Sequence, residues 1–217
     1  MPPLKNLLGG NFMNIYEAKK IIDEGGTVVV YDTETTGLKK ADSRILSFSA
    51  IKIVKDRDSF KEIDRRDIFI NPGCHIPEEV SAINHITDEA VKDCPTENEC
   101  CEEILNFLNS ADIVTGYNSV TFDDWFINEM SRRVTGKKWV PKAEIDTMSL
   151  AKDKLKKGVD VSSHKLCDIT EYFNAGEGLE FHNSIDDVIA TARVFWKLKE
   201  MYELPKPICA ATWENTG

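Results

Sequence analysis

The sequence predicts an α/β fold in which one mixed sheet is flanked by helices. Two observations support this prediction. In the first third of the chain, three apolar or β-branched segments (28–31, 44–54 and 67–70) follow one another with short connections, which is typical of an antiparallel meander. From residue 97 onward, helical patterns alternate with a short strand. A meander followed by α/β units fits one mixed sheet with helices on its faces.

The N-terminal elements have clear boundaries in the sequence. Residues 13–24 carry apolar side chains at helical spacing, and two glycines end this predicted helix. The segment 28–31 is a run of β-branched and aromatic residues, which predicts a buried strand with its turn at 35–37. The predicted strand 67–70 ends at an Asn-Pro-Gly turn.

The rest of the chain is mainly helical by the spacing of its apolar residues. Residues 97–109 form one predicted helix, and residues 112–115 form a predicted strand. Three further helices are indicated by apolar side chains three or four residues apart: Phe122, Phe126 and Met130; Leu166, Ile169 and Phe173; and Val188, Ala192, Phe195 and Trp196.

Composition predicts one globular domain. The chain has 217 residues, of which 41% are hydrophobic and 29% are charged, and such values suit one domain with a sizeable core. We expect the domain to span residues 13–203, between a tail at 1–12 and a C-terminal tail at 204–217. No apolar run approaches the length of a membrane span, and the N-terminus lacks the apolar core of a signal peptide. A cytoplasmic protein with reduced cysteines is therefore expected.

The net charge limits how the protein can meet nucleic acid. A formal charge of −10 and a pI near 5.0 argue against a general nucleic-acid coat protein, which would present a basic surface. An enzyme that meets nucleic acid at one small site through bound metal ions remains compatible with this charge. Such an enzyme is expected to bind weakly and to act on ends or single strands.

Two carboxylates, Asp32 and Glu34, come directly after the predicted strand 28–31. Residues two apart on a strand face the same side, so both carboxylates are expected to converge at the strand end. Like charges this close repel each other unless a cation lies between them, and oxygen ligands select hard cations such as Mg²⁺ or Mn²⁺. An isolated Asp-x-Glu is more often a solvated polar turn, but the string Asp-Thr-Glu-Thr-Thr-Gly-Leu at 32–38 is much more specific.

This string resembles the first motif of the DEDD (DnaQ-like) exonucleases, which include proofreading subunits of DNA polymerases, exonuclease I and several RNases. The resemblance implies a ribonuclease H-like fold with a five-stranded mixed sheet. Weaker matches at 71–90, 145–147 and 164–166 extend the resemblance over roughly residues 27–200. The first of these departs from the family at Asn84-His85, where the family usually has His-Gly.

The second motif of the family is an Asp at a helix start, preceded by Phe and, slightly earlier, by Asn. Asn118, Phe122 and Asp123 fit this pattern. Three residues rather than two separate Asn118 from Phe122, which resembles the exonuclease I branch. We favour Asp123 as the second-motif acid, with Asp124 as the alternative. Either acid would also complement the dipole of the helix that follows.

The third motif corresponds to residues 182–187, which resemble the family's His-x-Ala-x-x-Asp before the final helix. The five-residue offset allows His182 to lie in a loop while Asp187 lies in the first helical turn. A lone histidine before a helix is usually structural, but two other motifs in the expected order favour a catalytic interpretation. The presence of His182 rather than Tyr indicates the DEDDh branch.

The resemblance implies a metal-dependent 3′→5′ exonuclease that releases 5′-mononucleotides. It implies two divalent cations, Mg²⁺ or Mn²⁺, with Asp32 bridging both. Glu34 and Asp187 are implied to hold the ion that binds the attacking water, and Asp123 the second ion. His182 is the implied general base, because an imidazole titrates near neutral pH.

Five residues beside these acids are candidate substrate contacts: Thr35, Thr36, Gly37, Asn118 and Phe122. The resemblance implies that the threonines and their neighbours contact the terminal nucleotide. Phe122 or Tyr117 is a candidate to stack on a base, and core packing is at least as good an interpretation of both side chains.

Several alternatives remain open at the level of sequence. DNA or RNA 3′ ends are the expected partners, single strands being preferred, and the motif spacing favours single-stranded DNA over an RNase T-like or oligoribonuclease-like activity. A non-catalytic DnaQ-like binding module is less favoured because all five predicted catalytic residues are present. A phosphohydrolase acting on small nucleotides is the third alternative. A polymerase partner is possible, but the chain has no glutamine and hence no Gln-led clamp-binding motif, which favours a freestanding exonuclease.

Overall fold

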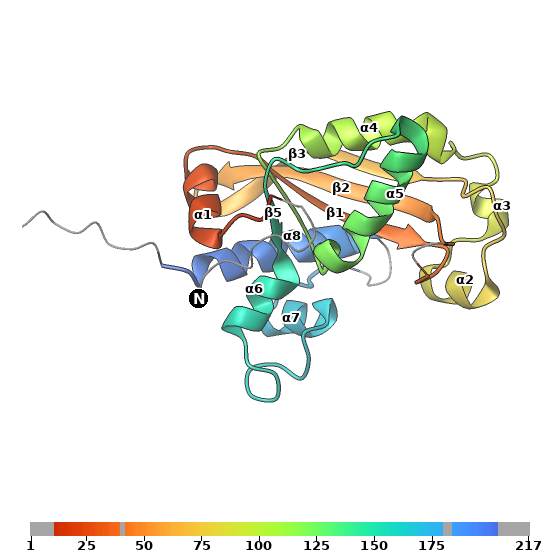
Figure 1. Ribbon diagram of the computed structural model, residues 1–217. Helices are drawn as coiled ribbons and strands as arrows, with labels where there is room; N and C mark the ends of the chain where they lie inside the picture. Colours follow the sequence, from red (N-terminus) through yellow and green to blue (C-terminus); the bar gives the residue numbers. More distant parts are fainter. Residues whose placement is uncertain (1–10, 40–41, 180–183, 204–217) are drawn as a thin grey trace, which may run out of the picture.

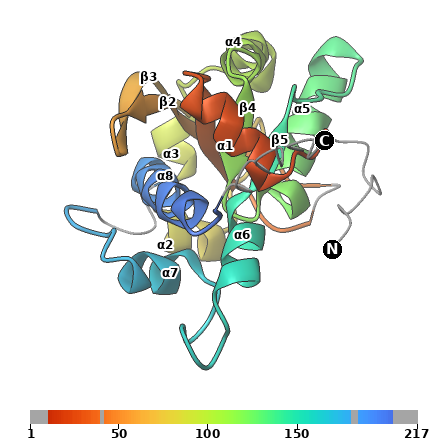
Figure 2. The same ribbon diagram turned by 90° about the vertical axis from the view of Figure 1, so that its left-hand side faces the viewer.

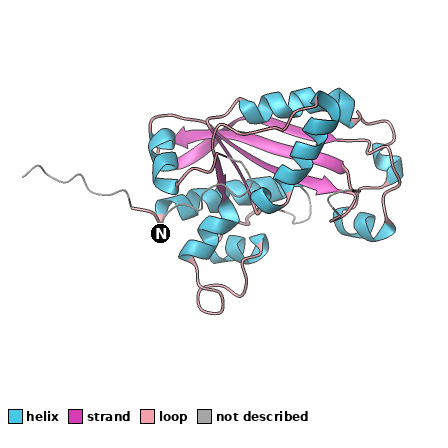
Figure 3. Ribbon diagram, in the orientation of Figure 1, coloured by secondary structure: helices cyan, strands magenta, loops and turns pink. Residues whose placement is uncertain are grey.

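A five-stranded mixed sheet forms the centre of the protein in the computed structural model, which describes residues 11–39, 42–179 and 184–203. The strand order is β3-β2-β1-β4-β5. The strands are β1 (Val28–Thr35), β2 (Ile45–Asp56), β3 (Ser59–Phe69), β4 (Ile113–Gly116) and β5 (Glu144–Asp146). The first three pair antiparallel, whereas β4 and β5 run parallel to β1. The predicted α/β class, the meander and the mixed sheet are confirmed (Figures 1 and 3).

Two strands are longer than the sequence predicts. β1 continues to Thr35, so the expectation that Asp32 and Glu34 follow the strand is wrong, and both lie within it. β3 begins at Ser59 rather than at residue 67, and most of its side chains are exposed. Charged side chains on an edge strand oppose pairing with another chain. Because these side chains are charged, the first part of β3 contains no apolar run that would predict a strand.

Eight α-helices accompany the sheet in the described part of the chain. They are α1 (Ile15–Asp23), α2 (Glu78–Asn84), α3 (Asp88–Val91), α4 (Glu97–Asn109), α5 (Asp123–Thr135), α6 (Thr147–Lys154), α7 (Leu166–Tyr172) and α8 (Ser184–Glu200). All helices predicted from apolar spacing are present. The helices α2, α3 and α6 and the strand β5 have no predicted counterpart, and each is a short element of three to eight residues.

The helices cover both faces of the sheet (Figure 2), and a large apolar core lies on each face. One core lies between the sheet and α1, α6, α7 and α8, and it includes Val30 and Phe195. The other lies between the opposite face and α4 and α5, and it includes Tyr31 and Phe126. Side chains alternate between the faces along a strand, so Asp32 lies on the face of Val30, under α8.

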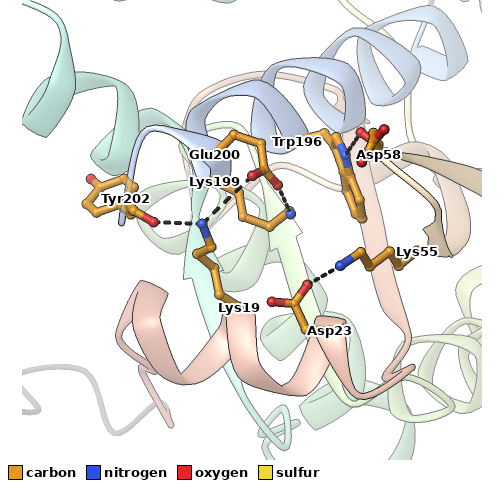
Figure 4. Close-up of polar contacts among 8 residues, drawn as sticks. All are labelled: Lys19, Asp23, Lys55, Asp58, Trp196, Lys199, Glu200 and Tyr202. Carbon is orange, nitrogen blue, oxygen red and sulfur yellow. Dashed lines mark hydrogen bonds and ion pairs between the residues drawn. The ribbon is translucent and has the colours of Figure 1, made fainter. Parts of the chain in front are cut away.

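Two buried lysines lie where the C-terminal end of α8 meets α1, and Lys19 joins the two (Figure 4). Lys19 is 8% exposed, and its Nζ donates a 2.6 Å hydrogen bond to the carbonyl oxygen of Tyr202. Lys199 is 1% exposed, pairs with Glu200, and places its Nζ 4.0 Å from the centre of the Trp196 ring. A buried cation requires such partners. The bond of Lys19 fixes the end of α8 relative to α1, whereas the contacts of Lys199 lie within α8.

The segment before α1 joins the edge of the sheet. Phe12 forms a parallel bridge with Glu144 of β5. The backbone N–H of Met13 donates to the carbonyl of Glu144, and that of Glu144 donates to the carbonyl of Asn11, each at 3.0 Å. Apart from these two residues, 11 and 12, the expected tails lie outside the described residues, so the domain limits 13–203 remain a prediction. Every helix among the described residues is too short or too polar to span a membrane.

We predict that Lys19→Met lowers the free energy of unfolding by about 1–3 kcal/mol, because the carbonyl of Tyr202 loses a buried donor. Urea denaturation followed by tryptophan fluorescence measures this change. Lys20→Met is the matched control, because Lys20 is exposed on the same helix, and it should change stability by less than about 0.5 kcal/mol. Equal stabilities of the two variants would contradict the anchoring role of Lys19.

Candidate active site

Asp32 and Glu34 lie on the part of β1 that extends beyond its pairing with β4. That pairing covers residues 28–30, whereas the pairing with β2 continues to Thr35. On β2, Ser49 is opposite Asp32 and Ser47 is opposite Glu34. Both carboxylates are half-buried and share the face of the sheet that α8 covers.

A tight turn after β4 directs α5 toward these carboxylates. A Cβ on Gly116 would lie 2.6 Å from the Cβ of Ser119 and 2.8 Å from the carbonyl oxygen of Tyr31, so only glycine fits without displacement. Asn118 then adopts the left-handed conformation with φ 68°, and a short 3-10 turn leads into α5. The turn places Asp123 at the first position of α5, beside β1.

Two hydrogen bonds fix Asp123 to β1. Asp123 is 3% exposed, and its Oδ1 accepts from the backbone N (3.0 Å) and the Oγ1 (2.6 Å) of Thr33. Burial raises the pKa of Asp123, while the hydrogen bonds from Thr33 act in the opposite direction. Because both bonds end on Oδ1, the other carboxylate oxygen takes no part in them.

Asp32 is the centre of a group of four carboxylates, which we call the Asp32 group: Asp32, Glu34, Asp123 and Asp187. Burial raises the pKa of Asp32 well above its usual range, and repulsion from Asp123, Glu34 and Asp187 raises it further. These neighbours come from α5, from β1 and from the first turn of α8. The fold thus brings the other three acids singled out in the sequence within electrostatic reach of Asp32.

Asp124, the alternative second-motif acid, is turned toward β5. Its Oδ1 accepts a hydrogen bond from the Tyr31 hydroxyl, and its carboxylate shares a hydrogen bond with the side chain of Glu144. Burial is the main cause that raises the pKa of Asp124. Asp123 rather than Asp124 therefore adds to the charge that surrounds Asp32.

Glu144 is a buried acid that the sequence pattern does not single out. It is 1% exposed on β5, and its Oε1 has no hydrogen-bond partner among the described residues. Burial raises the pKa of Glu144 well above its usual range, and the charge of Asp124 adds to this effect. Two carboxyl groups form a hydrogen bond only when one carries a proton, and the raised pKa makes Glu144 that partner. The sequence marks Glu144 only as a glutamate within a short apolar segment. Its role as a partner acid becomes clear only when the fold places it beside Asp124.

The turn after β1 holds three of the predicted substrate contacts in internal hydrogen bonds. The hydroxyl of Thr35 donates to the carbonyl of Gly37 at 2.9 Å, and the hydroxyl of Thr36 accepts from the backbone N of Arg44 at 3.0 Å. Both threonines are buried, whereas Leu38, directly after the turn, is 80% exposed. The threonine hydroxyls thus shape the turn, and Leu38 is its accessible side chain.

The other predicted contacts lie before α5, and the predicted base is not described. Asn118 accepts a 2.7 Å hydrogen bond from the hydroxyl of Thr121. Phe122 is half-buried, with its ring centre 5.0 Å from that of Phe126, so it contributes to core packing. His182 lies outside the described residues, two positions before α8 begins.

The Asp32 group has the donor chemistry of a site for hard cations, which prefer carboxylate oxygens. No three His, Cys, Asp or Glu side chains within residues 11–39, 42–179 and 184–203 are gathered closely enough to hold a metal ion as they stand. Mutual repulsion separates carboxylates whose charge is not compensated. The raised pKa of Asp32 is consistent with that repulsion, which a bound cation would relieve.

A family profile described as "Exonuclease" matches residues 29–195. The chain belongs to this exonuclease family. The matched region contains the whole Asp32 group, from β1 to the first turn of α8. The match confirms the resemblance to the DnaQ-like exonucleases that the sequence motifs indicate.

Three known proteins are similar to this chain, one in sequence and two in structure. The DNA polymerase III PolC-type of Caldanaerobacter subterraneus subsp. tengcongensis is 30% identical over 175 residues, which are 81% of this chain and 12% of that protein. E. coli exonuclease I in complex with a dT13 oligonucleotide has a TM-score of 0.65 at 22% identity, covering 80% of this chain and 41% of that one. Exonuclease X in complex with 5′ overhanging duplex DNA has a TM-score of 0.58 at 21% identity, covering 80% and 92%. The two structures confirm the fold class, and the chain spans 12% or less of the first curated relatives.

We predict that Glu144→Gln makes the protein more stable at pH 8 by roughly 1–3 kcal/mol and has little effect near pH 4. The folded-state pKa of Glu144 lies above its usual value of 4.5, so the folded state retains a proton that the unfolded state releases. The resulting contribution to stability is present below that usual value and is lost as the pH rises toward the folded-state pKa. Glutamine is neutral at every pH and still donates to Asp124.

Urea denaturation between pH 4 and pH 8 measures this pH dependence. Glu102→Gln is the matched control, because it removes an exposed glutamate from α4 and should leave the shape of the stability curve unchanged. Parallel curves for Glu144→Gln and the wild type would show that Glu144 ionises freely in the folded protein.

Proposed function

We propose that this chain is a metal-dependent 3′→5′ exonuclease that hydrolyses single-stranded DNA to 5′-mononucleotides. The observation that supports this function most directly is the Asp32 group, found in a chain of the exonuclease family. Phosphodiester hydrolysis develops negative charge that must be stabilised. Half-buried acids that repel one another at the end of a strand supply a place for the cations that would do so.

Each acid of the Asp32 group has a proposed role. Two divalent cations such as Mg²⁺ or Mn²⁺, when bound, would act as Lewis acids toward the attacking and leaving oxygens of the phosphodiester. We propose that Asp32 contacts both ions, that Glu34 and Asp187 hold the one nearer the attacking water, and that Asp123 holds the other. The hydrogen bonds of Thr33 to Oδ1 of Asp123 restrain that carboxylate, and its other oxygen is the proposed ligand atom.

His182 is the proposed general base. It lies two positions before α8 in the sequence, and α8 carries Asp187 in its first turn. An imidazole near its ordinary pKa accepts a proton readily at neutral pH, which suits removal of a proton from an attacking water.

The terminal nucleotide is proposed to bind over the turn after β1. Thr35, Thr36 and Gly37 are proposed to contact it mainly through backbone groups, because both threonine hydroxyls already bond within the turn. The exposed Leu38 offers an apolar surface to the base. Asn118 and Phe122, which precede α5, are proposed contacts on the other side of the Asp32 group.

DNA is the proposed substrate because the curated relatives are PolC-type DNA polymerases. A polymerase partner remains compatible with that similarity, and we propose residues 13–203 as the catalytic domain. The net charge of −10 disfavours tight binding along a duplex, which agrees with action on ends and single strands.

We predict that 5′-labelled single-stranded DNA is shortened stepwise from its 3′ end, so that the label persists on a descending ladder. The reaction should require Mg²⁺ or Mn²⁺ and should stop with EDTA. A matched RNA of the same sequence should be degraded more slowly. Immediate release of the labelled nucleotide would contradict the direction, activity in EDTA would contradict the metal requirement, and faster RNA cleavage would assign an exoribonuclease.

We predict that Asp32→Asn abolishes nuclease activity without lowering the free energy of unfolding. Asparagine preserves the shape of the side chain and removes one of the charges that repel each other in the Asp32 group. Asp56→Asn is the matched control, because Asp56 is exposed at the far end of β2, and it should keep wild-type activity. Wild-type degradation of labelled DNA by Asp32→Asn would refute the proposed site.

We predict that His182→Ala lowers kcat on the order of 10²–10⁴-fold, the usual reach of general-base catalysis. Binding of Mn²⁺ should change little, because the proposed ligands are carboxylates. The variant should also lose the limb of the pH–rate profile that reports the imidazole. A profile of unchanged shape would remove His182 from this role.

A further inference from the structure

A row of polar side chains crosses the sheet next to the Asp32 group. Asp32 on β1 is opposite Ser49 on β2, and Ser49 is opposite Asp67 on β3. Residues directly opposite in antiparallel strands project from the same face, so this row lies on the face that α8 covers. Ser184, the first residue of α8, lies above the row.

Hydrogen bonds join this row to α8. Oγ of Ser49 donates to Oδ1 of Asp67 at 2.7 Å, and Oγ of Ser184 lies 2.5 Å from Oγ of Ser49. Oγ of Ser47 donates to Oγ of Ser184 over a longer 3.5 Å. The helix is thus tied to β2 through hydroxyl groups in addition to apolar contacts.

The direction of these hydrogen bonds follows from the number of protons. Each serine hydroxyl has one proton to donate, and an ionised carboxylate can only accept. Since Ser49 gives its proton to Asp67, Ser184 must donate to Ser49. Asp67 is exposed to water, where a carboxylate is well solvated, so the chain of donors ends on a group that needs no further partner.

Burial makes these hydrogen bonds costly to break. Ser47 and Ser49 are fully buried, and Ser184 is 8% exposed. A buried hydroxyl that loses its partner costs more than a solvated one, because water cannot replace the lost bond. The first turn of α8 therefore has one strongly preferred position on β2.

We propose that Ser184, Ser49 and Asp67 form a hydrogen-bonded relay that positions the first turn of α8, and with it Asp187, over Asp32. Ser184 and Asp187 are three residues apart and hence neighbours on the helix surface, and Asp187 acts on Asp32 electrostatically. This inference rests on the proposed nuclease function. The three relay residues are positioning residues, because none is proposed to touch metal or substrate.

Arg65 on the edge strand lies within electrostatic reach of the same turn of α8. Arg65 lies two residues before Asp67 on β3 and pairs with Glu62 at 2.7 Å. The charges of Asp67 and Asp186 also raise the pKa of Arg65. Asp186 is the neighbour of Asp187 in the first turn of α8. β3 thus influences this turn both through the relay and through Arg65.

Ser184 stands where the family motif resembled by residues 182–187 has alanine, so Ser184→Ala is expected to fold. We predict that it lowers kcat about 10-fold and raises the Mg²⁺ concentration for half-maximal activity by a similar factor. A loss of about 10-fold is the lower end of the range for mutation of groups that orient metal ligands. KM for the oligonucleotide should stay within about twofold, because substrate contacts are unchanged. Asp67→Ala should lower kcat and raise the required Mg²⁺ concentration in the same way. Asp67→Asn should restore both values, because its amide oxygen still accepts the hydrogen bond from Ser49.

Controls separate positioning from stability. Ser131→Ala removes a buried serine whose hydroxyl donates to the carbonyl of Lys137 at 2.8 Å, toward the far end of α5, and it should leave kcat and metal dependence unchanged. Ser49→Ala and the double variant with Ser184→Ala test the shared bond, since losses from one interaction are not multiplied when both partners are removed. Urea denaturation of each variant shows whether the protein is folded under assay conditions.

The outcomes distinguish the relay from the nuclease function itself. An inactive wild type that binds no Mn²⁺ by titration calorimetry would overturn both. If an inactive wild type binds Mn²⁺, the relay still requires weaker Mn²⁺ binding in Ser184→Ala, and equal binding overturns it. With an active wild type, the relay is overturned if Ser184→Ala matches Ser131→Ala, if Asp67→Asn fails as Asp67→Ala does, or if the losses multiply in the double variant.

Discussion

Repulsion among the four carboxylates of the Asp32 group is the constraint on which the rest of the structure depends. Burial and three like charges disfavour the ionised form of Asp32, so the group would separate if each acid lay on a mobile loop. Instead, two acids lie on a central strand and the others occupy the first turns of α5 and α8. The apolar cores on both faces of the sheet contribute the stability that offsets this repulsion.

Each element that carries an acid is fixed by contacts close to that acid. Gly116 permits the approach of α5 to β1, and Thr33 then binds Asp123 through two hydrogen bonds. α8 is fixed at both ends, by Ser184 on β2 and by Lys19 on the carbonyl of Tyr202. A helix held at both ends cannot slide along the sheet, and this rigidity keeps Asp187 near Asp32.

The sequence predicts the parts of this arrangement that depend on local pattern. The β-branched run before Asp32 and the helical spacing around Phe126 are strong signals, and both elements are present. The first half of β3 and the whole of β5 are not predictable in this way, because charged edge residues and a three-residue strand carry no periodic apolar signal. The contacts of Ser184 with Ser49 and of Asp124 with Glu144 depend on register and helix placement, which exist only after tertiary folding.

Two adjacent residues, Asp123 and Asp124, show how the fold treats buried acids in two different ways. Asp124 bonds to Tyr31 and to Glu144, and a proton on Glu144 removes the repulsion within that pair. Burial raises the pKa of Asp123, and its hydrogen bonds from Thr33 oppose that rise. A proton relieves the repulsion between Asp124 and Glu144, whereas Asp123 adds to the repulsion around Asp32. Consecutive residues at the start of a helix point in different directions, and that geometry lets the fold neutralise one acid pair while the neighbouring acid is directed toward Asp32.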